Sequence, residues 1–367
     1  MITTAEDSQM MARALELARR GMYTTDPNPR VGCVIANDGK IVGEGWHEKA
    51  GEPHAEIQAL NNVEQSQRYG ATVYITLEPC CHRGKTPPCT HALKKAGVGR
   101  AVVAMADPNP EVKGQGIAEL EHTGIPVQVG LMETEARALN PGFISRMERG
   151  RPYVRIKLAT SFDGRTALAD GESKWITEPA AREDVQHWRA RSSAILTGVS
   201  TVLMDDPSLN VRLSDIECLQ PLRVVLDSTL RMPPTAQMLR LPGKTLVVTM
   251  ADDSEQAQKL TAAGAEILFL DAKSKAINLK SLMTQLASRE INELHIEAGA
   301  TLCGAFIRAG LVDELVLYMA PHIMGSHARG MFNFPSLESM ADRIRLETQD
   351  VRAVGRDWRF VCKVVNQ

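Results

Sequence analysis

A histidine, a glutamate and two cysteines in the first quarter of the sequence have the types and spacing of a metal site. His54 lies two residues before Glu56, and Cys80 and Cys89 flank a short proline-containing segment. Imidazole and thiolate are zinc ligands, and a catalytic zinc keeps three protein ligands with a fourth position open. A carboxylate two residues after the histidine is poorly placed as a ligand but well placed to move protons. We therefore expect zinc ligands at His54, Cys80 and Cys89, and a catalytic role in proton transfer for Glu56.

Plainer interpretations compete with a catalytic site. A lone histidine or glutamate at such positions is more often a solvated helix residue than a functional one. A closed structural zinc site is the stronger competitor, because Cys81 or His82 could supply a fourth ligand. The carboxylate two residues after His54 favours the open site, in which an activated water attacks an amino-bearing ring carbon.

The composition of the chain limits the classes of protein to consider. Its 367 residues, 44% of them hydrophobic, are enough for two buried cores. A formal net charge of −2 without a basic block argues against nucleic-acid binding and favours a small-molecule ligand. The sequence contains no apolar stretch of about 18 residues and no leader-like start, so we expect a cytoplasmic protein that does not bind membranes. Seven cysteines, three of them crowded together, fit metal binding better than disulfides in a reducing compartment.

The pattern of apolar residues predicts the elements that must position these side chains. Asp7 and Ser8 are expected to cap a first helix, and residues 37–40 to form the turn of a hairpin. Helices should begin near Pro53 and at Cys89, which places the metal ligands at helix N-termini, where thiolates are favoured. Strands that alternate with helices after Cys89 predict a largely parallel sheet covered by helices.

A second α/β pattern begins after residues 149–152, where an Arg-Gly-Arg-Pro segment indicates a domain boundary. A strand at residues 293–297 leads into a small-residue turn and a helix, an arrangement at which nucleotide phosphates commonly bind. Polar clusters occur at Lys157 with residues 161–165, at residues 173–177 and at residues 198–212. Each cluster could also be an ordinary turn or part of the core. On these residues alone, the second half is predicted only to be an α/β domain that can bind a nucleotide.

Motifs in both halves resemble one family. Residues 27–29, 51–56 and 76–89 resemble the deaminase half of the bifunctional riboflavin-biosynthesis deaminase/reductases, and the polar clusters of the second half resemble its reductase half. Eight residues separate Cys80 from Cys89, as in this family, whereas base-editing and cytidine deaminases usually have two. The chain departs from the family at Cys81, which is often serine, and at Ala298, which is often glycine.

This resemblance implies an α/β fold in two domains. Residues 1–148 would form a cytidine-deaminase-like three-layer domain, and residues 149–367 a dihydrofolate-reductase-like α/β domain. The first would deaminate 2,5-diamino-6-ribosylamino-4(3H)-pyrimidinone 5′-phosphate to 5-amino-6-ribosylaminouracil 5′-phosphate with zinc. The second would reduce the ribosyl group to a ribityl group with NADPH. We expect a phosphorylated pyrimidine as the substrate, no nucleic-acid partner, and a homo-oligomer.

The resemblance also implies roles for residues beyond the metal site. Substrate contacts in the deaminase half are implied for Asn28, His82, Lys85 and Thr86, although the spacing around Asn28 fits a plain turn equally well. NADPH contacts are implied for Ala159, Trp175, Thr201, Asp205, Ser228, Gly299, Ala300 and Thr301. The pentose-phosphate site is implied at Lys157, Ser173, Arg189, Leu209, Arg212 and Glu297. Arginine suits a phosphate because its guanidinium can donate two parallel hydrogen bonds.

Two functions of other classes make different predictions. A nucleic-acid- or nucleoside-editing zinc deaminase with an accessory nucleotide-binding domain would need a basic face, against which the net charge of −2 argues. A non-catalytic, zinc-stabilised binding module predicts that Glu56→Gln leaves every turnover intact.

Overall fold

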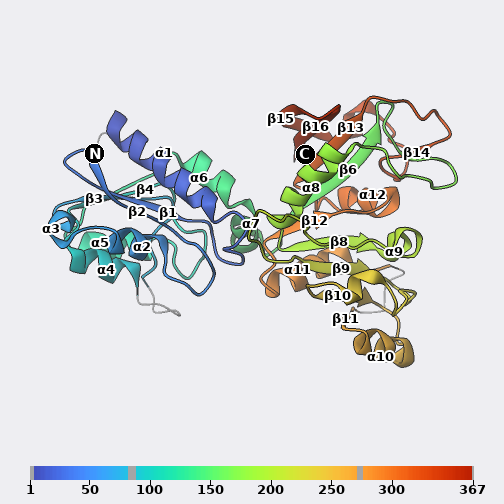
Figure 1. The fold of residues 1–367 in the computed structure, drawn as a ribbon, viewed down its shortest axis with the longest axis horizontal. Helices are drawn as coiled ribbons and strands as arrows, with labels where there is room; N and C mark the ends of the chain where they lie inside the picture. The colour runs from blue at the N-terminus through green and yellow to red at the C-terminus, as the bar shows by residue number, and fades with distance from the viewer. Residues whose placement is uncertain (1–3, 82–87, 271–275, 366–367) are drawn as a thin grey trace. The chain divides into compact units, whose positions relative to one another are not determined.

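The computed structural model describes residues 4–81, 88–270 and 276–365. The chain forms two compact units, Met1–Arg151 and Pro152–Gln367, each with its own sheet and its own core (Figure 1). Within the described ranges, every helix is too short or too polar to cross a bilayer.

The N-terminal unit is built on a five-stranded sheet with the order β2-β1-β3-β4-β5. Its strands are β1 (Gly32–Asn37), β2 (Lys40–Trp46), β3 (Thr72–Ile75), β4 (Arg100–Val103) and β5 (Val127–Val129). Strand β1 runs antiparallel to both β2 and β3, and β3, β4 and β5 are parallel. The predicted hairpin is confirmed, because Asp38 and Gly39 form its turn with φ values of 46° and 74°.

Helices cover both faces of this sheet, which makes three layers (Figure 1). The helices are α1 (Ala5–Arg20), α2 (Ala55–Asn61), α3 (Gln65–Arg68), α4 (Cys89–Ala96), α5 (Gln115–His122), α6 (Glu133–Leu139) and α7 (Pro141–Arg149). Alternate residues of β1 point to opposite faces. Val34 packs in the core with α1 and α6, whereas Ile35 packs in the core with α2, α4 and α5.

The start of helix α1 differs from the prediction. Thr4, rather than Asp7 or Ser8, is the cap: its hydroxyl accepts from the Asp7 amide at 3.0 Å, and the Asp7 carboxylate accepts from the Thr4 amide at 2.9 Å. This reciprocal arrangement is a capping box, which satisfies two helix donors at once. The prediction of Asp7 and Ser8 as caps was wrong because the capping hydroxyl belongs to Thr4, three residues before Asp7.

The C-terminal unit is built on a nine-stranded sheet with the order β11-β10-β9-β8-β12-β6-β13-β16-β15. Its strands are β6 (Tyr153–Ser161), β8 (Ala194–Gly198), β9 (Leu222–Leu226), β10 (Thr245–Thr249), β11 (Ala265–Phe269), β12 (Glu293–Ile296), β13 (Glu314–Ala320), β15 (Arg345–Val354) and β16 (Asp357–Val365). The strands from β11 to β13 are all parallel, and β16 and β15 add an antiparallel edge. Strands β7 (Arg165–Ala167) and β14 (Arg329–Gly330) form a separate small sheet.

Helices pack on both faces of the large sheet. They are α8 (Pro179–Ala190), α9 (Val199–Asp205), α10 (Ser254–Ala262), α11 (Leu279–Ser288) and α12 (Ala300–Arg308), with 3₁₀ turns η1 (Gln237–Arg240) and η2 (Met340–Asp342). Because β9, β8, β12 and β6 are parallel neighbours, the segments that follow these strands leave from the same edge of the sheet. In open α/β sheets, ligands bind at that edge.

Candidate functional site

The predicted metal ligands converge in the N-terminal unit. His54 is the residue before helix α2, Cys80 lies beyond the end of β3, and Cys89 is the first residue of α4. The His54 Nδ1 atom lies 3.5 Å from the Cys80 Sγ and 3.4 Å from the Cys89 Sγ, and the three ligand atoms lie within 4.8 Å of one another. Tetrahedral zinc with bonds of roughly 2.0–2.3 Å separates its ligand atoms by about 3.6 Å. The donor set and its spacing therefore fit zinc.

Close packing of helix α2 on strand β2 holds the histidine and the nearby carboxylate in place. A Cβ atom at Gly45 would lie 2.3 Å from the Ala59 amide nitrogen and 2.5 Å from the Ala55 carbonyl oxygen, so only glycine allows this approach. The first turn of α2 is therefore fixed against the sheet, and His54 and Glu56 belong to that turn.

The electrostatics of this group favour a bound cation. Burial and, to a smaller extent, the negative charge of Cys80 raise the pKa of Glu56 to about 7. A hydrogen bond from the Cys89 thiol lowers the pKa of Cys80, while the same contact and burial raise the pKa of Cys89. Two thiolates and a carboxylate confined in one buried site repel one another. His54, Cys80 and Cys89 would hold a divalent metal ion, whose charge would relieve that repulsion and favour the thiolate form of both cysteines.

Asn28 is linked to this group through a histidine, His47, that was not predicted. Its amide nitrogen lies 3.0 Å from the His47 Nε2, and the His47 Nδ1 lies 3.3 Å from the Pro53 carbonyl oxygen. The His47 ring meets the His54 ring edge-on, with centroids 5.3 Å apart. If Asn28 donates, His47 carries its proton on Nδ1 and connects the Asn28 loop to the metal ligands. In the sequence, His47 is only the residue at the exit of the hairpin, and nothing local singles it out.

Cys81 and His82 are the two residues that could supply a fourth zinc ligand. Cys81 is half-buried and does not belong to the metal-binding group found among the described residues. His82, Lys85 and Thr86 lie outside the described residues. Of the two adjacent cysteines that follow Pro79, the structure therefore brings Cys80 to His54, as expected.

In the C-terminal unit, the predicted pentose-phosphate residues meet around a buried ion pair. The Arg189 guanidinium on α8 donates twice to Glu297, at 2.6 and 2.9 Å. A third donation from Arg189 reaches the Asn210 carbonyl oxygen at 3.1 Å. The Thr197 hydroxyl donates to the Glu297 carbonyl oxygen at 2.7 Å. These contacts fix the segment after β12 to α8 and to the loop after α9.

Two further cations surround Glu297. Burial lowers the pKa of Lys157 on β6, and the Glu297 charge opposes that effect. Burial would raise the pKa of Glu297, but Arg189, with His295 and Lys157, holds it well below its usual range. Exposed Arg212 lies close enough to sense both charges of the ion pair, and its guanidinium donates to Ser208 and Asn210. The group combines one largely shielded carboxylate with three cationic side chains.

The remaining residues predicted for the pentose-phosphate site lie on the neighbouring loops. Leu209 is buried with a φ of 42° and directly precedes Asn210, whose carbonyl oxygen accepts from Arg189. Ser173 is half-buried and precedes Lys174, whose ammonium lies 3.5 Å from the Asp205 carboxylate.

The residues predicted for NADPH lie on segments at the carboxyl ends of neighbouring parallel strands. Ala159 lies near the end of β6, Ser228 follows β9, Thr201 and Asp205 lie on α9 after β8, and Gly299, Ala300 and Thr301 begin α12 after β12. Trp175 is 70% exposed and lies under the Arg182 guanidinium, 4.5 Å from the ring centroid. This exposure rules out the interpretation of Trp175 as a core residue.

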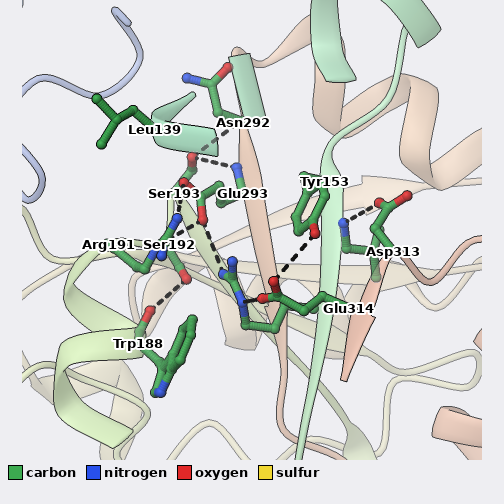
Figure 2. A network of polar contacts seen from close by, with 12 residues as sticks. Leu139, Tyr153, Trp188, Arg191, Ser192, Ser193, Asn292, Glu293, Asp313 and Glu314 are labelled. Atoms are coloured by element: carbon green, nitrogen blue, oxygen red, sulfur yellow. Dashed lines mark hydrogen bonds and ion pairs between the residues drawn. The ribbon is translucent and has the colours of Figure 1, made fainter. Parts of the chain in front are cut away.

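Two groups of buried polar residues were not predicted. His295 is fully buried on β12, and its Nε2 lies 3.5 Å from the Glu297 carboxylate. At the opposite ends of the same strands, Arg155 donates to Glu293 at 3.0 Å and also to Glu314; Figure 2 shows the two glutamates converging from their strands. Arg155 looks like an ordinary strand position in the sequence, because its partners Glu293 and Glu314 are more than a hundred residues away.

Comparisons with known proteins agree with both halves. Residues 152–360 match the model of the RibD C-terminal domain, and residues 4–105 match that of the cytidine and deoxycytidylate deaminase zinc-binding region. The chain is 48% identical over 363 residues to the riboflavin biosynthesis protein RibD of Escherichia coli strain K12, across 96% of this chain and 98% of that protein.

Solved structures give the same result. Acinetobacter baumannii RibD, form 1, superposes with a TM-score of 0.92 and 47% identity, over 98% of this chain and 99% of that one. A diaminohydroxyphosphoribosylaminopyrimidine deaminase/5-amino-6-(5-phosphoribosylamino)uracil reductase from Thermotoga maritima superposes with a TM-score of 0.87 and 30% identity, over 98% and 99%. The predicted fold class, a cytidine-deaminase-like domain followed by a reductase domain, is confirmed. The chain belongs to the RibD family of bifunctional deaminase/reductases of riboflavin biosynthesis.

Proposed function

We propose that this chain catalyses two consecutive steps on one phosphorylated pyrimidine. The domain at residues 1–148 would deaminate 2,5-diamino-6-ribosylamino-4(3H)-pyrimidinone 5′-phosphate, and the domain at residues 149–367 would reduce the ribosyl group of the product with NADPH. The observation that carries the proposal is the convergence of His54, Cys80 and Cys89 next to buried Glu56. The two activities named for the Thermotoga maritima relative support it.

In the deaminase site, the residues of this chain divide the work. His54, Cys80 and Cys89 would hold zinc, which when bound supplies an activated water. Glu56 would accept a proton and return it to the ring nitrogen and the departing amino group, as in other zinc deaminases. Burial already raises the pKa of Glu56 to about 7, which suits a group that must both gain and lose a proton. Asn28 would contact the substrate.

In the reductase site, the side chains would bind and orient rather than react. NADPH supplies the hydride. Lys157, Arg189, Arg212 and Glu297, with Ser173 and Leu209, would line the pentose-phosphate site, because cationic groups around one carboxylate suit a phosphate and sugar hydroxyls. The segments at the strand ends, with Ala159, Trp175, Thr201, Asp205, Ser228 and residues 299–301, would hold the dinucleotide. In the deaminase site, His82, Lys85 and Thr86 would also contact the substrate.

The substitution Glu56→Gln tests the proposal. It removes the proton carrier but keeps the shape of the side chain, so ammonia release should fall about 10²–10⁴-fold, the usual contribution of a positioned acid–base group. NADPH oxidation should be unchanged when deaminated pyrimidine is supplied. The matched control is Glu64→Gln at an exposed position of the same unit, which should leave both rates unchanged. Full ammonia release by Glu56→Gln would instead mean that Glu56 is not the proton carrier of the reaction.

We also propose that the protein is cytoplasmic and forms a homo-oligomer. A reducing compartment keeps the thiols of Cys80 and Cys89 free for zinc. The strand β15 is the last in the large sheet and is largely exposed, and such edges are commonly covered by a partner. Sedimentation velocity measures the oligomeric state.

A further inference from the structure

Glu78 makes contacts that the proposed zinc chemistry does not use. Its side chain is only 4% exposed, and it lies two residues before a proposed zinc ligand. One carboxylate oxygen accepts from the amides of Asp107 at 2.9 Å and Gly114 at 3.0 Å. The other accepts from the amides of Gly116 at 2.9 Å and Ile117 at 3.2 Å. Hydrogen bonds to an ionised acceptor are the stronger kind, and here four of them converge on one side chain.

These contacts hold the first turn of helix α5 against the segment that carries Cys80. A Cβ atom at Gly116 would lie 2.0 Å from the Pro79 carbonyl oxygen, so the helix rests directly on the backbone beside the proposed ligand. The Glu78 amide also donates to the Met105 carbonyl oxygen at 3.0 Å, which ties the exit of β3 to the exit of β4.

A second link joins the same helix to the same segment. Glu119, on α5, accepts from the Thr90 hydroxyl at 2.9 Å. The Thr90 amide in turn donates to the Cys80 carbonyl oxygen at 3.3 Å. Helix α5 therefore contacts the Cys80 segment from two sides, once through Glu78 and once through Thr90.

We propose that Glu78 is a positioning residue for zinc: by clamping helix α5 onto the Cys80 segment, it holds that thiol at the distance that the metal requires. The inference rests on the proposed ligand set of His54, Cys80 and Cys89. Groups that orient a metal ligand without touching the metal commonly change metal affinity about 10–100-fold when they are removed. The carboxylate acts here through backbone amides, because it lies at the base of the ligand-bearing segment rather than beside the metal.

The substitution Glu78→Gln tests this role in the full-length, zinc-loaded protein. The side chain keeps its size, but an NH₂ group replaces one acceptor and faces two backbone donors. Zinc transfer to a chromogenic chelator should become about tenfold faster or more. In the cobalt-substituted variant, the thiolate-to-cobalt absorption band should shift or weaken. The rate of NADPH oxidation should be unchanged, because the reductase site lies in the other unit. The matched control, Glu121→Gln, changes an exposed carboxylate of the same helix and should release zinc at the wild-type rate.

Zinc release from Glu78→Gln at the wild-type rate, with an unchanged cobalt spectrum, would overturn the inference. If Glu78→Gln does not fold, Gly116→Ala provides the test. Its added Cβ would clash with the Pro79 carbonyl oxygen and push α5 away from the Cys80 segment. Faster zinc release from Gly116→Ala supports the clamp, and wild-type release refutes it. The release assay needs no turnover, so a wild-type protein that fails to deaminate would count against the proposed function alone.

Discussion

At the scale of single residues, the pairing of Arg189 with Glu297 fixes the position of the carboxylate in the proposed pentose-phosphate site. Both side chains are largely shielded from solvent, and the two parallel donations at 2.6 and 2.9 Å use the planar shape of the guanidinium. Lysine would keep the positive charge but could not make both donations and the third contact to Asn210. The geometry of the carboxylate would then be lost while the net charge stays the same.

We therefore expect Arg189→Lys to lower kcat/KM for reduction of the deaminated pyrimidine at least about tenfold, because a buried pair with one poorly matched partner costs more than 1.4 kcal/mol. Steady-state NADPH oxidation measures this effect, and ammonia release in the same preparation should not change. The exposed Arg356→Lys serves as the control. An unchanged kcat/KM in Arg189→Lys would place the substrate elsewhere.

The zinc ligands could be predicted from the sequence because their signal is local: a histidine two residues before a glutamate, and two cysteines that each directly follow a proline. His47, Glu78 and His295 carry no such signal. The Glu78 carboxylate takes its partners from 29 to 39 residues further along the chain, and its burial depends on how β3 and α5 meet. A role of this kind is defined by the fold rather than by neighbouring residues.

At the scale of elements, helix α1 is locked to the sheet at its N-terminus through Asp7. The Arg100 guanidinium donates to both Asp7 oxygens, at 2.9 and 3.1 Å, and the Tyr74 hydroxyl donates at 2.9 Å. Burial opposes ionisation of this carboxyl, but the hydrogen bonds from Arg100, Thr4 and Tyr74 prevail and lower its pKa to about 2. The ionised form therefore stabilises the folded N-terminal unit.

The sign of the pH effect follows from this lowered pKa. The stabilisation is fully present above the ordinary pKa near 3.8 and is lost as the pH falls toward about 2. A shift of this size corresponds to about 2 kcal/mol. We expect Asp7→Asn to lower the free energy of unfolding by up to about that amount at pH 7 and by little at pH 2. Urea unfolding followed by circular dichroism measures both values. Asp38→Asn, in the exposed hairpin turn, should show no such pH-dependent difference.

Element types were predictable wherever periodicity and turn residues decide them. The hairpin at Asp38 and Gly39, the helix beginning at Cys89, and the interruption between α6 and α7 at Pro141 all follow from local chemistry. The N-terminal cap of α1 was not predictable in this way. Thr4, Asp7 and Ser8 are all good capping residues, and only the reciprocal hydrogen bonds between Thr4 and Asp7 select Thr4. The strand order could not be predicted either, since β6 pairs with strands more than 130 residues away.

At the scale of the whole molecule, the two proposed sites belong to separate compact units. Removal of zinc by a strong chelator should therefore abolish ammonia release while leaving NADPH oxidation on deaminated pyrimidine intact. Addition of zinc should restore the first activity. Loss of both activities together would mean that the metal also supports the reductase unit. The two rates should be measured on one chelated sample so that protein loss affects both equally.

The position of β6 in the large sheet has a consequence for synthesis of the chain. Its neighbours β12 and β13 span residues 293–320, so the middle of that sheet cannot close until most of the chain exists. The five-stranded sheet, by contrast, is complete once Val129 has been made. Because domains tend to fold as units during translation and distant pairings form slowly, the metal ligands can be gathered on the ribosome while the reductase unit is still an open chain. Zinc loading would then precede the maturation of the second site.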